Sequence, residues 1–223
     1  MSFGQAECKP EPLILLVIRN AQTRSHLRGW YVGGADEPLS LQGQSQVKFA
    51  AAEISAAGLS DVVSRVYVSP LLRSRQTASV LFPAAEQVVV EELRERSFGT
   101  FEATELSQLE QDPAYAQWLE SGRDSVPPQG EGREEFQRRA MAGLSAVLDH
   151  AHAAGGSEVV VMAHGEAIKA CFYGMADEPG SFQGWRAAPC GGYVAEARLD
   201  QGGWTLCGCV AFARLADVLS DFA

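Results

Sequence analysis

The sequence predicts an α/β sandwich, and three observations support this fold class. Short apolar runs alternate with segments of helical periodicity, an order typical of a sheet covered by helices. The first run, residues 13–18, is apolar without a break, as in a strand that is buried on both faces. Residues 94–130, approximately, are polar and too irregular for a sheet layer, which indicates a flap or cap.

Residues that start or stop helices place the remaining elements. Ser40 can cap a helix whose end is marked by Gly58, and Pro70 can open the helix after the second strand. Gly155 and Gly156 stop the clearest helix, in which apolar residues recur at helical spacing. We therefore expect helices at residues 40–58, 70–81, 133–154 and 166–175, and strands at 13–18, 66–69, 88–90, 158–163, 193–199 and 204–211, the last two being candidates for an antiparallel pair.

Length and charge limit the classes of function. The 223 residues suit one large domain or two small ones, and we expect a single domain over residues 1–223. The formal charge of −10 argues against nucleic acid or an anionic membrane as the main partner, although convergent arginines can still bind a small anion. No apolar run approaches a membrane span, and residues 1–12 lack the features of a signal peptide, so a cytoplasmic location is expected.

The five cysteines indicate neither a disulfide framework nor a metal site. Their number is odd, and no Cys-x-x-Cys pair occurs. Cys207 and Cys209 lie in an apolar segment, and no second cluster or nearby histidine completes a site with them. We therefore expect no metal and no other cofactor.

Polar groups follow three of the predicted strands, where open α/β sheets place their ligands. These groups are Arg19 with Asn20, Ser69 with Arg73, and His164 with Gly165. Arginines together with free N–H groups at helix starts favour a phosphate. Glu95, beneath the expected flap, could deliver a proton if its pKa is raised. Taken singly, each side chain also fits an ordinary structural role, so the argument depends on their joint placement.

Several motifs, in order along the chain, resemble those of one family. Residues 17–23, Val-Ile-Arg-Asn-Ala-Gln-Thr, are similar to the Arg-His-Gly-Glu-Thr signature of the histidine phosphatase superfamily, the phosphoglycerate-mutase-like proteins. The similarity continues through about residue 175. It includes the stretch from Gly33 to Gln46, Ser-Pro-Leu-Leu-Arg-Ser-Arg-Gln-Thr-Ala at 69–78, the segment from Leu93 to Glu102, Gly130-Glu131, and Val-Met-Ala-His-Gly at 161–165.

The resemblance implies a fold and a site. The fold would be a three-layer α/β/α sandwich with a mostly parallel, mixed sheet and a small helical cap. The phosphate pocket would consist of Arg19, Arg73 and His164, and Glu95 would be the proton donor. Gln22 and Thr23 would border the pocket, with Gly165 also contributing to substrate binding. His26 stands where the family often has an asparagine that contacts phosphate.

One residue departs from the pattern. The family's nucleophile is the histidine after the first arginine, and this chain has Asn20 there. A histidine ring nitrogen can carry the phosphoryl group, whereas the lone pair of an amide nitrogen is delocalised into its carbonyl. Asn20 can still hydrogen-bond a phosphate. We therefore expect phosphate binding without turnover by the family mechanism, and activity in the Asn20→His variant.

Several alternatives remain open at this stage. Asn20 is either natural, which would make the chain a pseudo-enzyme, or an inactivating change. His26 could be a substitute nucleophile, although it would act from a loop. A non-catalytic binding or scaffolding protein is the competing class.

The short cap favours the hydrolytic branch over phosphoglycerate mutase-type phosphoryl transfer. Residues that could line the leaving-group side are Arg28, Trp30, Tyr31, Tyr115 and Trp118, although the aromatic ones are equally suited to a cap core. We expect a small phosphorylated partner or inorganic phosphate, and a homodimer is considered.

Overall fold

The sheet has six strands in the order β3-β2-β4-β1-β5-β6. The computed structural model describes residues 11–58 and 61–219, so the expected domain limits at residues 1 and 223 and Cys8 lie outside the described part. β1, β2, β3 and β4 are parallel, whereas β5 is antiparallel to both β1 and β6. The strands are β1 (Leu13–Arg19), β2 (Arg65–Val68), β3 (Glu86–Val89), β4 (Glu158–Ala163), β5 (Gly192–Asp200) and β6 (Gly203–Phe212). The predicted α/β class with a mostly parallel, mixed sheet is therefore confirmed.

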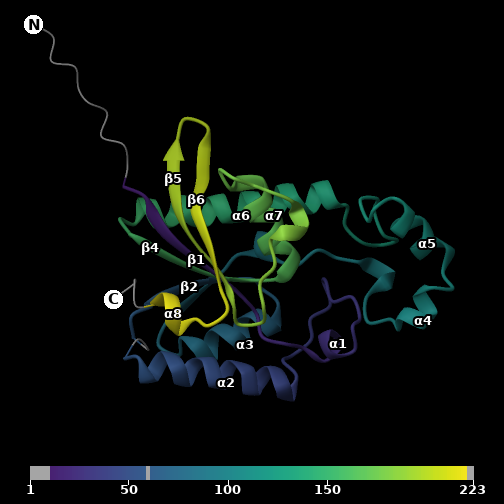
Figure 1. Ribbon diagram of the computed structural model, residues 1–223, viewed down its shortest axis with the longest axis horizontal. Coiled ribbons are helices and arrows are strands. Elements are labelled where there is room, and N and C mark those ends of the chain that lie inside the picture. Colours follow the sequence, from purple (N-terminus) through teal and green to yellow (C-terminus); the bar gives the residue numbers. More distant parts are fainter. Residues whose placement is uncertain (1–10, 59–60, 220–223) are drawn as a thin grey trace, which may run out of the picture.

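Helices cover both faces of the sheet (Figure 1). Successive side chains of a strand point to opposite faces, and those of β1 divide in this way. Leu15 and Val17 pack with α6 (Arg133–Ala153) and α7 (Gly165–Met175). Leu16 and Ile18 pack in the second apolar cluster, on the face covered by α2 (Leu41–Ala56), α3 (Leu72–Leu81) and α8 (Ala216–Leu219). The three expected layers are present.

The helix boundaries match the sequence signals except at α3. Ser40 caps α2 by accepting a hydrogen bond from the Gly43 N–H at 2.9 Å, and Gly58 follows its end with φ +73°. The expected start of the next helix at Pro70 is wrong, because Leu71 is still extended with ψ 136°. The hydroxyl of Ser69 accepts the Leu71 N–H at 3.4 Å, which forms a turn between β2 and α3.

The segment after β3, which we call the cap, includes the residues expected to form a flap or cap, at about 94–130. It contains the short helices η1 (Glu91–Leu93), η2 (Gly99–Phe101), α4 (Leu106–Leu109) and α5 (Pro113–Glu120). In Figure 1, α4 and α5 lie apart from the sheet, beyond α1 (Arg24–Leu27). Their apolar side chains form a cluster distinct from the two on the sheet, which we call the cap cluster: Phe98, Phe101, Leu109, Tyr115 and Trp118, with Tyr31 packed against it.

Two kinds of feature are absent from residues 11–58 and 61–219. No helix there is long and apolar enough to cross a membrane. No group of three or more His, Cys, Asp or Glu side chains is placed to hold a metal ion.

Candidate active site

Three parallel strands bring the expected site residues together at the carboxyl ends of the strands. Arg19 pairs in register with Ala163, and Val68 pairs with Met162. The residues that follow these positions, Asn20, Ser69 and His164, therefore emerge together at the carboxyl ends of β1, β2 and β4. This is the edge at which α/β folds bind ligands.

His164 connects the three strand ends through its two ring nitrogens. The side chain is 1% exposed, with Nδ1 2.9 Å from Asn20 Oδ1 and Nε2 2.6 Å from Ser69 Oγ. The amide of Asn20 donates from Nδ2 to the carbonyl of Ala21 at 2.7 Å, which leaves Oδ1 as an acceptor. We therefore assign the imidazole hydrogen to Nδ1, with the Ser69 hydroxyl donating to Nε2.

Arg73 also approaches His164. Its Nε lies 3.3 Å from Nδ1, a contact that requires the opposite tautomer, and we favour the Asn20 contact because it is shorter. Burial, followed by the charge of Arg73, holds the pKa of His164 well below its usual value. The imidazole is therefore neutral at physiological pH.

The two arginines are held by backbone carbonyls. Arg73 is 1% exposed and donates to the carbonyls of Gly33 and Ala35, both at 2.8 Å. Arg19 donates to the carbonyl of Ala187 at 2.8 Å and lies against Gly165, whose added Cβ would come within 3.4 Å of its guanidinium carbon. Neither arginine forms an ion pair within the described residues. Their charges are therefore available to an anion.

Glu95 lies between η1 and η2, and its buried carboxyl group faces the start of α7. It is 6% exposed, and its two oxygens accept the N–H groups of Arg96 at 2.9 Å and Glu166 at 3.0 Å. Burial, together with the charge of Glu166, raises the pKa of Glu95, and these N–H groups and Arg73 offset the shift only in part. A carboxyl group with a raised pKa can retain a proton and donate it.

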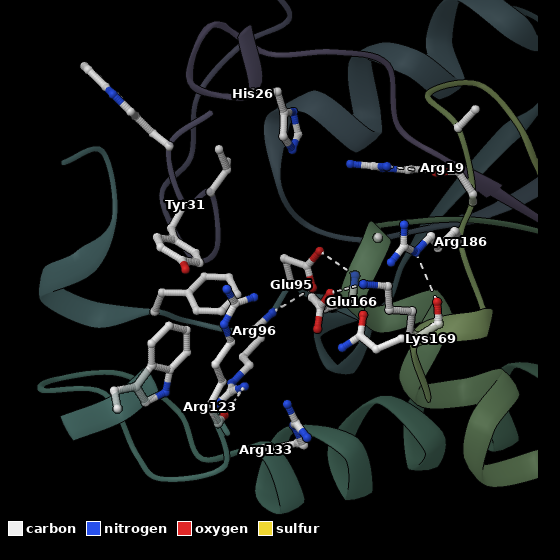
Figure 2. A pocket seen from close by; sticks show the side chains of 18 residues that line it. Arg19, His26, Tyr31, Glu95, Arg96, Arg123, Arg133, Glu166, Lys169 and Arg186 are labelled. Carbon is white, nitrogen blue, oxygen red and sulfur yellow. Dashed lines mark hydrogen bonds and ion pairs between the residues drawn. The ribbon is translucent and has the colours of Figure 1, made fainter. Parts of the chain in front are cut away.

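A cavity of about 580 Å³ opens between the sheet edge and the cap (Figure 2). Of the predicted site residues, Arg19, His26, Glu95 and Gly165 line it, as do Trp30, Tyr31 and Trp118. Its other lining residues are Val32, Arg96, Phe98, Arg123, Arg133, Glu166, Lys169, Gln183, Arg186, Ala187 and Ala188. Asn20, Arg73 and His164 are buried and are not among the lining residues. Asn20 follows Arg19 and His164 precedes Gly165 in the sequence, and Arg73 contacts His164.

Some predicted contacts with the cavity are not present. Thr23 is fully buried and caps α1, and the backbone of Gln22 bonds to Ser40 and Gln46, so neither residue lines the cavity. Arg28 instead stacks over the Trp30 ring at 4.5 Å, and Tyr115 belongs to the cap cluster.

Five cationic residues in the lining were missed by sequence reasoning. Lys169 could have been found, because it lies one helical turn beyond Gly165 and so shares its face of the helix. The other four lie in the cap, at a helix start or in a loop, where no periodic pattern shows which way a side chain points. They are Arg96, Arg123, Arg133 and Arg186.

Comparison with known families matches residues 15–209 to the histidine phosphatase superfamily, branch 1. The chain belongs to this superfamily. The match covers most of β1, the cap, the helices α2, α3, α6 and α7, and most of β6. The family expected from the motifs is therefore confirmed.

Relatives of this histidine phosphatase superfamily member carry two kinds of name. A 2,3-bisphosphoglycerate-dependent phosphoglycerate mutase from Brucella anthropi is 27% identical over 163 residues, 70% of this chain and 78% of the mutase. An adenosylcobalamin/α-ribazole phosphatase from Salmonella typhimurium is 32% identical over 135 residues, 59% of this chain and 65% of the phosphatase. The solved α-ribazole phosphatase from Shigella flexneri has a similar fold, with a TM-score of 0.70 and 24% identity over 87% of this chain and 94% of that one.

Proposed function

We propose that this chain binds a phosphomonoester on a phosphatase scaffold and that hydrolysis through a phosphohistidine is lost or severely impaired in it. The observation that carries the proposal is the set of groups around Asn20. A neutral imidazole, two arginines without carboxylate partners and a carboxyl group with a raised pKa lie at one sheet edge. These groups suit a phosphate and its leaving group, and by the motif resemblance Asn20 would stand where the family has its histidine nucleophile.

The arginines supply the charge that binds phosphate. Burying a guanidinium is costly, and backbone carbonyls satisfy hydrogen bonds without cancelling the charge of Arg19 or Arg73. A phosphate dianion would cancel both charges in a site that excludes most water. Arg19 lines the cavity directly, so its guanidinium is the better placed of the two to contact the ligand.

The family chemistry needs a group that Asn20 cannot supply. In that chemistry a histidine nitrogen attacks phosphorus, the ester P–O bond breaks, and the leaving oxygen takes a proton, here from Glu95. Water then attacks the phosphohistidine, gives its proton to the Glu95 carboxylate and releases phosphate. In this chain Nδ2 of Asn20 donates to Ala21 and Oδ1 faces His164, so neither atom can attack.

His26 is better suited to donate a hydrogen bond than to replace the nucleophile. Its Nδ1 accepts the Thr23 N–H at 3.3 Å and lies 2.9 Å from the Thr23 hydroxyl. The hydrogen of the neutral ring is therefore on Nε2. A nitrogen that carries hydrogen has no lone pair with which to attack phosphorus.

Binding of phosphate is expected to raise the pKa of His26 from its value of about 4. Burial is the main cause of that low value, and the charges of Arg19 and Arg73 lower it further. Bound phosphate would cancel those charges and accept the Nε2–H, so the protonated ring becomes more favourable. An NMR titration of the imidazole with and without inorganic phosphate measures the shift. An unchanged value at saturating phosphate would place His26 away from the anion.

We propose that the scaffold is that of a hydrolase and not of a mutase, because the cap is short. Only a short stretch separates Glu95 from Glu131, which lies just before α6 and pairs with Arg139 of that helix, and a small cap screens a phosphoenzyme from water poorly. The mutase name of the Brucella anthropi relative keeps transfer as the second candidate. Release of phosphate by Asn20→His, measured beside phosphoryl exchange with 3-phosphoglycerate, separates the two.

The chain as it stands is expected to bind inorganic phosphate and vanadate, measured by isothermal titration calorimetry. Arg19→Ala should weaken binding by about 10- to 100-fold, since it removes a charge-assisted hydrogen bond. Arg198→Ala is the matched control, because it removes the same charge from an exposed pair with Glu196 on β5. Failure of the unaltered chain to bind either anion would end the proposal.

A further inference from the structure

The cavity carries more positive charge than one phosphate group needs. Six lining side chains are cationic and two are carboxylates, a formal surplus of four positive charges in a chain whose total is −10. The cations are Arg19, Arg96, Arg123, Arg133, Lys169 and Arg186, and the carboxylates are Glu95 and Glu166. Like charges repel when they are gathered in one place, so this concentration predicts an anionic ligand.

The cationic side chains differ in whether a carboxylate partners them. Lys169 Nζ pairs with Glu166 at 2.6 Å, and Arg133 pairs with Asp124. Arg123 and Arg186 are exposed and have no carboxylate partner among the ion pairs of the described residues.

We call Arg123, Arg133, Lys169 and Arg186 the outer basic cluster. Arg96 is excluded from it, because its guanidinium donates to the carbonyls of Glu131, Arg123 and Ser125 and so holds the cap together.

Separate segments deliver the outer basic cluster to the cavity. Arg123 follows α5, Arg133 begins α6, Lys169 lies on α7 and Arg186 lies in the loop before β5. In Figure 2, Arg123 and Arg133 lie on the opposite side of the cavity from His26. Arg133 and Lys169 lie against the same Phe182 ring, at 5.2 and 5.9 Å from its centroid. The cluster is thus a feature of the folded cavity and not of one charged stretch of sequence.

The size of the cavity leaves room for more than a phosphate group. About 580 Å³ lies within the range of sites for ligands of drug-like size, of which a phosphate fills a small part. Trp30 and Tyr31, both half-buried, add apolar surface to the lining. A ligand whose phosphate lies beside Arg19 therefore has room to extend to Arg123 and Arg133, on the opposite side of the cavity from His26.

We propose that the leaving group of the phosphomonoester carries a second anionic group, a carboxylate or a further phosphate, that the outer basic cluster binds. This inference rests on the proposed function, since it assumes that the first phosphate binds beside Arg19. It adds a charge requirement at the far end of the ligand. The surplus charge would then set which phosphoesters the protein accepts.

Three phenyl phosphates test the inference with the chain as it stands. 4-Carboxyphenyl phosphate and 4-carbamoylphenyl phosphate have nearly the same shape and differ in charge, and phenyl phosphate has neither group. By calorimetry at low ionic strength, the carboxylate should bind about 10-fold more tightly than the amide, and added salt should reduce the ratio. The double variant Arg123→Ala, Arg186→Ala should bring the ratio close to 1, and Arg198→Ala should leave it unchanged.

The outcomes separate this inference from the proposed function. Equal affinity for the carboxylate and the amide, with phenyl phosphate still bound, would overturn the second anionic group alone. A preference for carboxylate that survives the double variant would overturn its assignment to the outer basic cluster. Absence of binding by phenyl phosphate and by inorganic phosphate would overturn both proposals.

Discussion

Asn20→His is expected to raise the rate of p-nitrophenyl phosphate hydrolysis by on the order of 10⁴-fold or more, the usual cost of removing one member of a cooperating catalytic set. Asn20 is 2% exposed at the end of β1, in contact with His164 and beside Arg19. Arg19, the neighbouring residue, lines the cavity, so an imidazole at position 20 is expected to reach a phosphate that binds there. The measurement is release of p-nitrophenol by both proteins at equal concentration.

Two further variants control this experiment. Asn20→Ala and Asn20→Gln introduce no nucleophile, so both should remain as inactive as the unaltered chain. An acid-labile phosphoenzyme, seen by ³¹P NMR or by mass spectrometry, should form only in Asn20→His. If Asn20→His folds with an unchanged Tm and still releases no phosphate, the scaffolding alternative is favoured.

Glu95→Gln, made in the Asn20→His background, is expected to lower kcat/KM for phenyl phosphate by about 10²- to 10⁴-fold. Glutamine keeps the size of the side chain but has no proton to give to the leaving oxygen. The loss should be smaller for p-nitrophenyl phosphate, because p-nitrophenolate leaves without being protonated. This dependence on the leaving group separates proton donation from a merely structural role of Glu95.

The pH dependence of kcat/KM is a second test of the role of Glu95. Burial and the charge of Glu166 raise the pKa of Glu95, so kcat/KM of Asn20→His should fall as the pH rises through that value. Glu166→Gln is the matched control, because it keeps Glu95 as the proton donor but removes one cause of its raised pKa. The decrease in kcat/KM should then occur at lower pH. If Asn20→His hydrolyses phenyl phosphate equally well with and without the Glu95→Gln change, Glu95 is not the proton donor.

The buried strands could be predicted from sequence because burial on both faces requires an uninterrupted apolar run. The strand predicted at residues 158–163 matches β4, and the central strand β1 differs from its prediction by one residue. β3 is an outermost strand of the sheet, is half-exposed and has a weaker apolar pattern. The start predicted from the sequence is therefore two residues late. Pro70 misled the prediction of α3 because a proline is equally compatible with the turn that precedes a helix.

Site residues attached to strand ends were predictable, and those attached to loops were not. Arg19, Asn20 and His164 follow from the parallel register of β1 and β4, which sequence patterns can indicate. Arg123 has φ +68°, and Arg186 lies in a loop, so only the folded backbone shows that both face one cavity. Gln22 is not among the residues that line the cavity, and its backbone ties the end of β1 to the start of α2, so its place at the border of the phosphate pocket stays a prediction.

The cap cluster has a consequence for how this protein could diversify. Its aromatic residues pack mainly with one another and apart from the two clusters that hold the sheet and its helices. Substitutions around α5 can therefore reshape the wall that meets the leaving group while Arg73 and His164 stay in place. A fold built in this way allows new substrates to be acquired by changing the residues around α5, while Glu95 and the groups at the strand ends are retained.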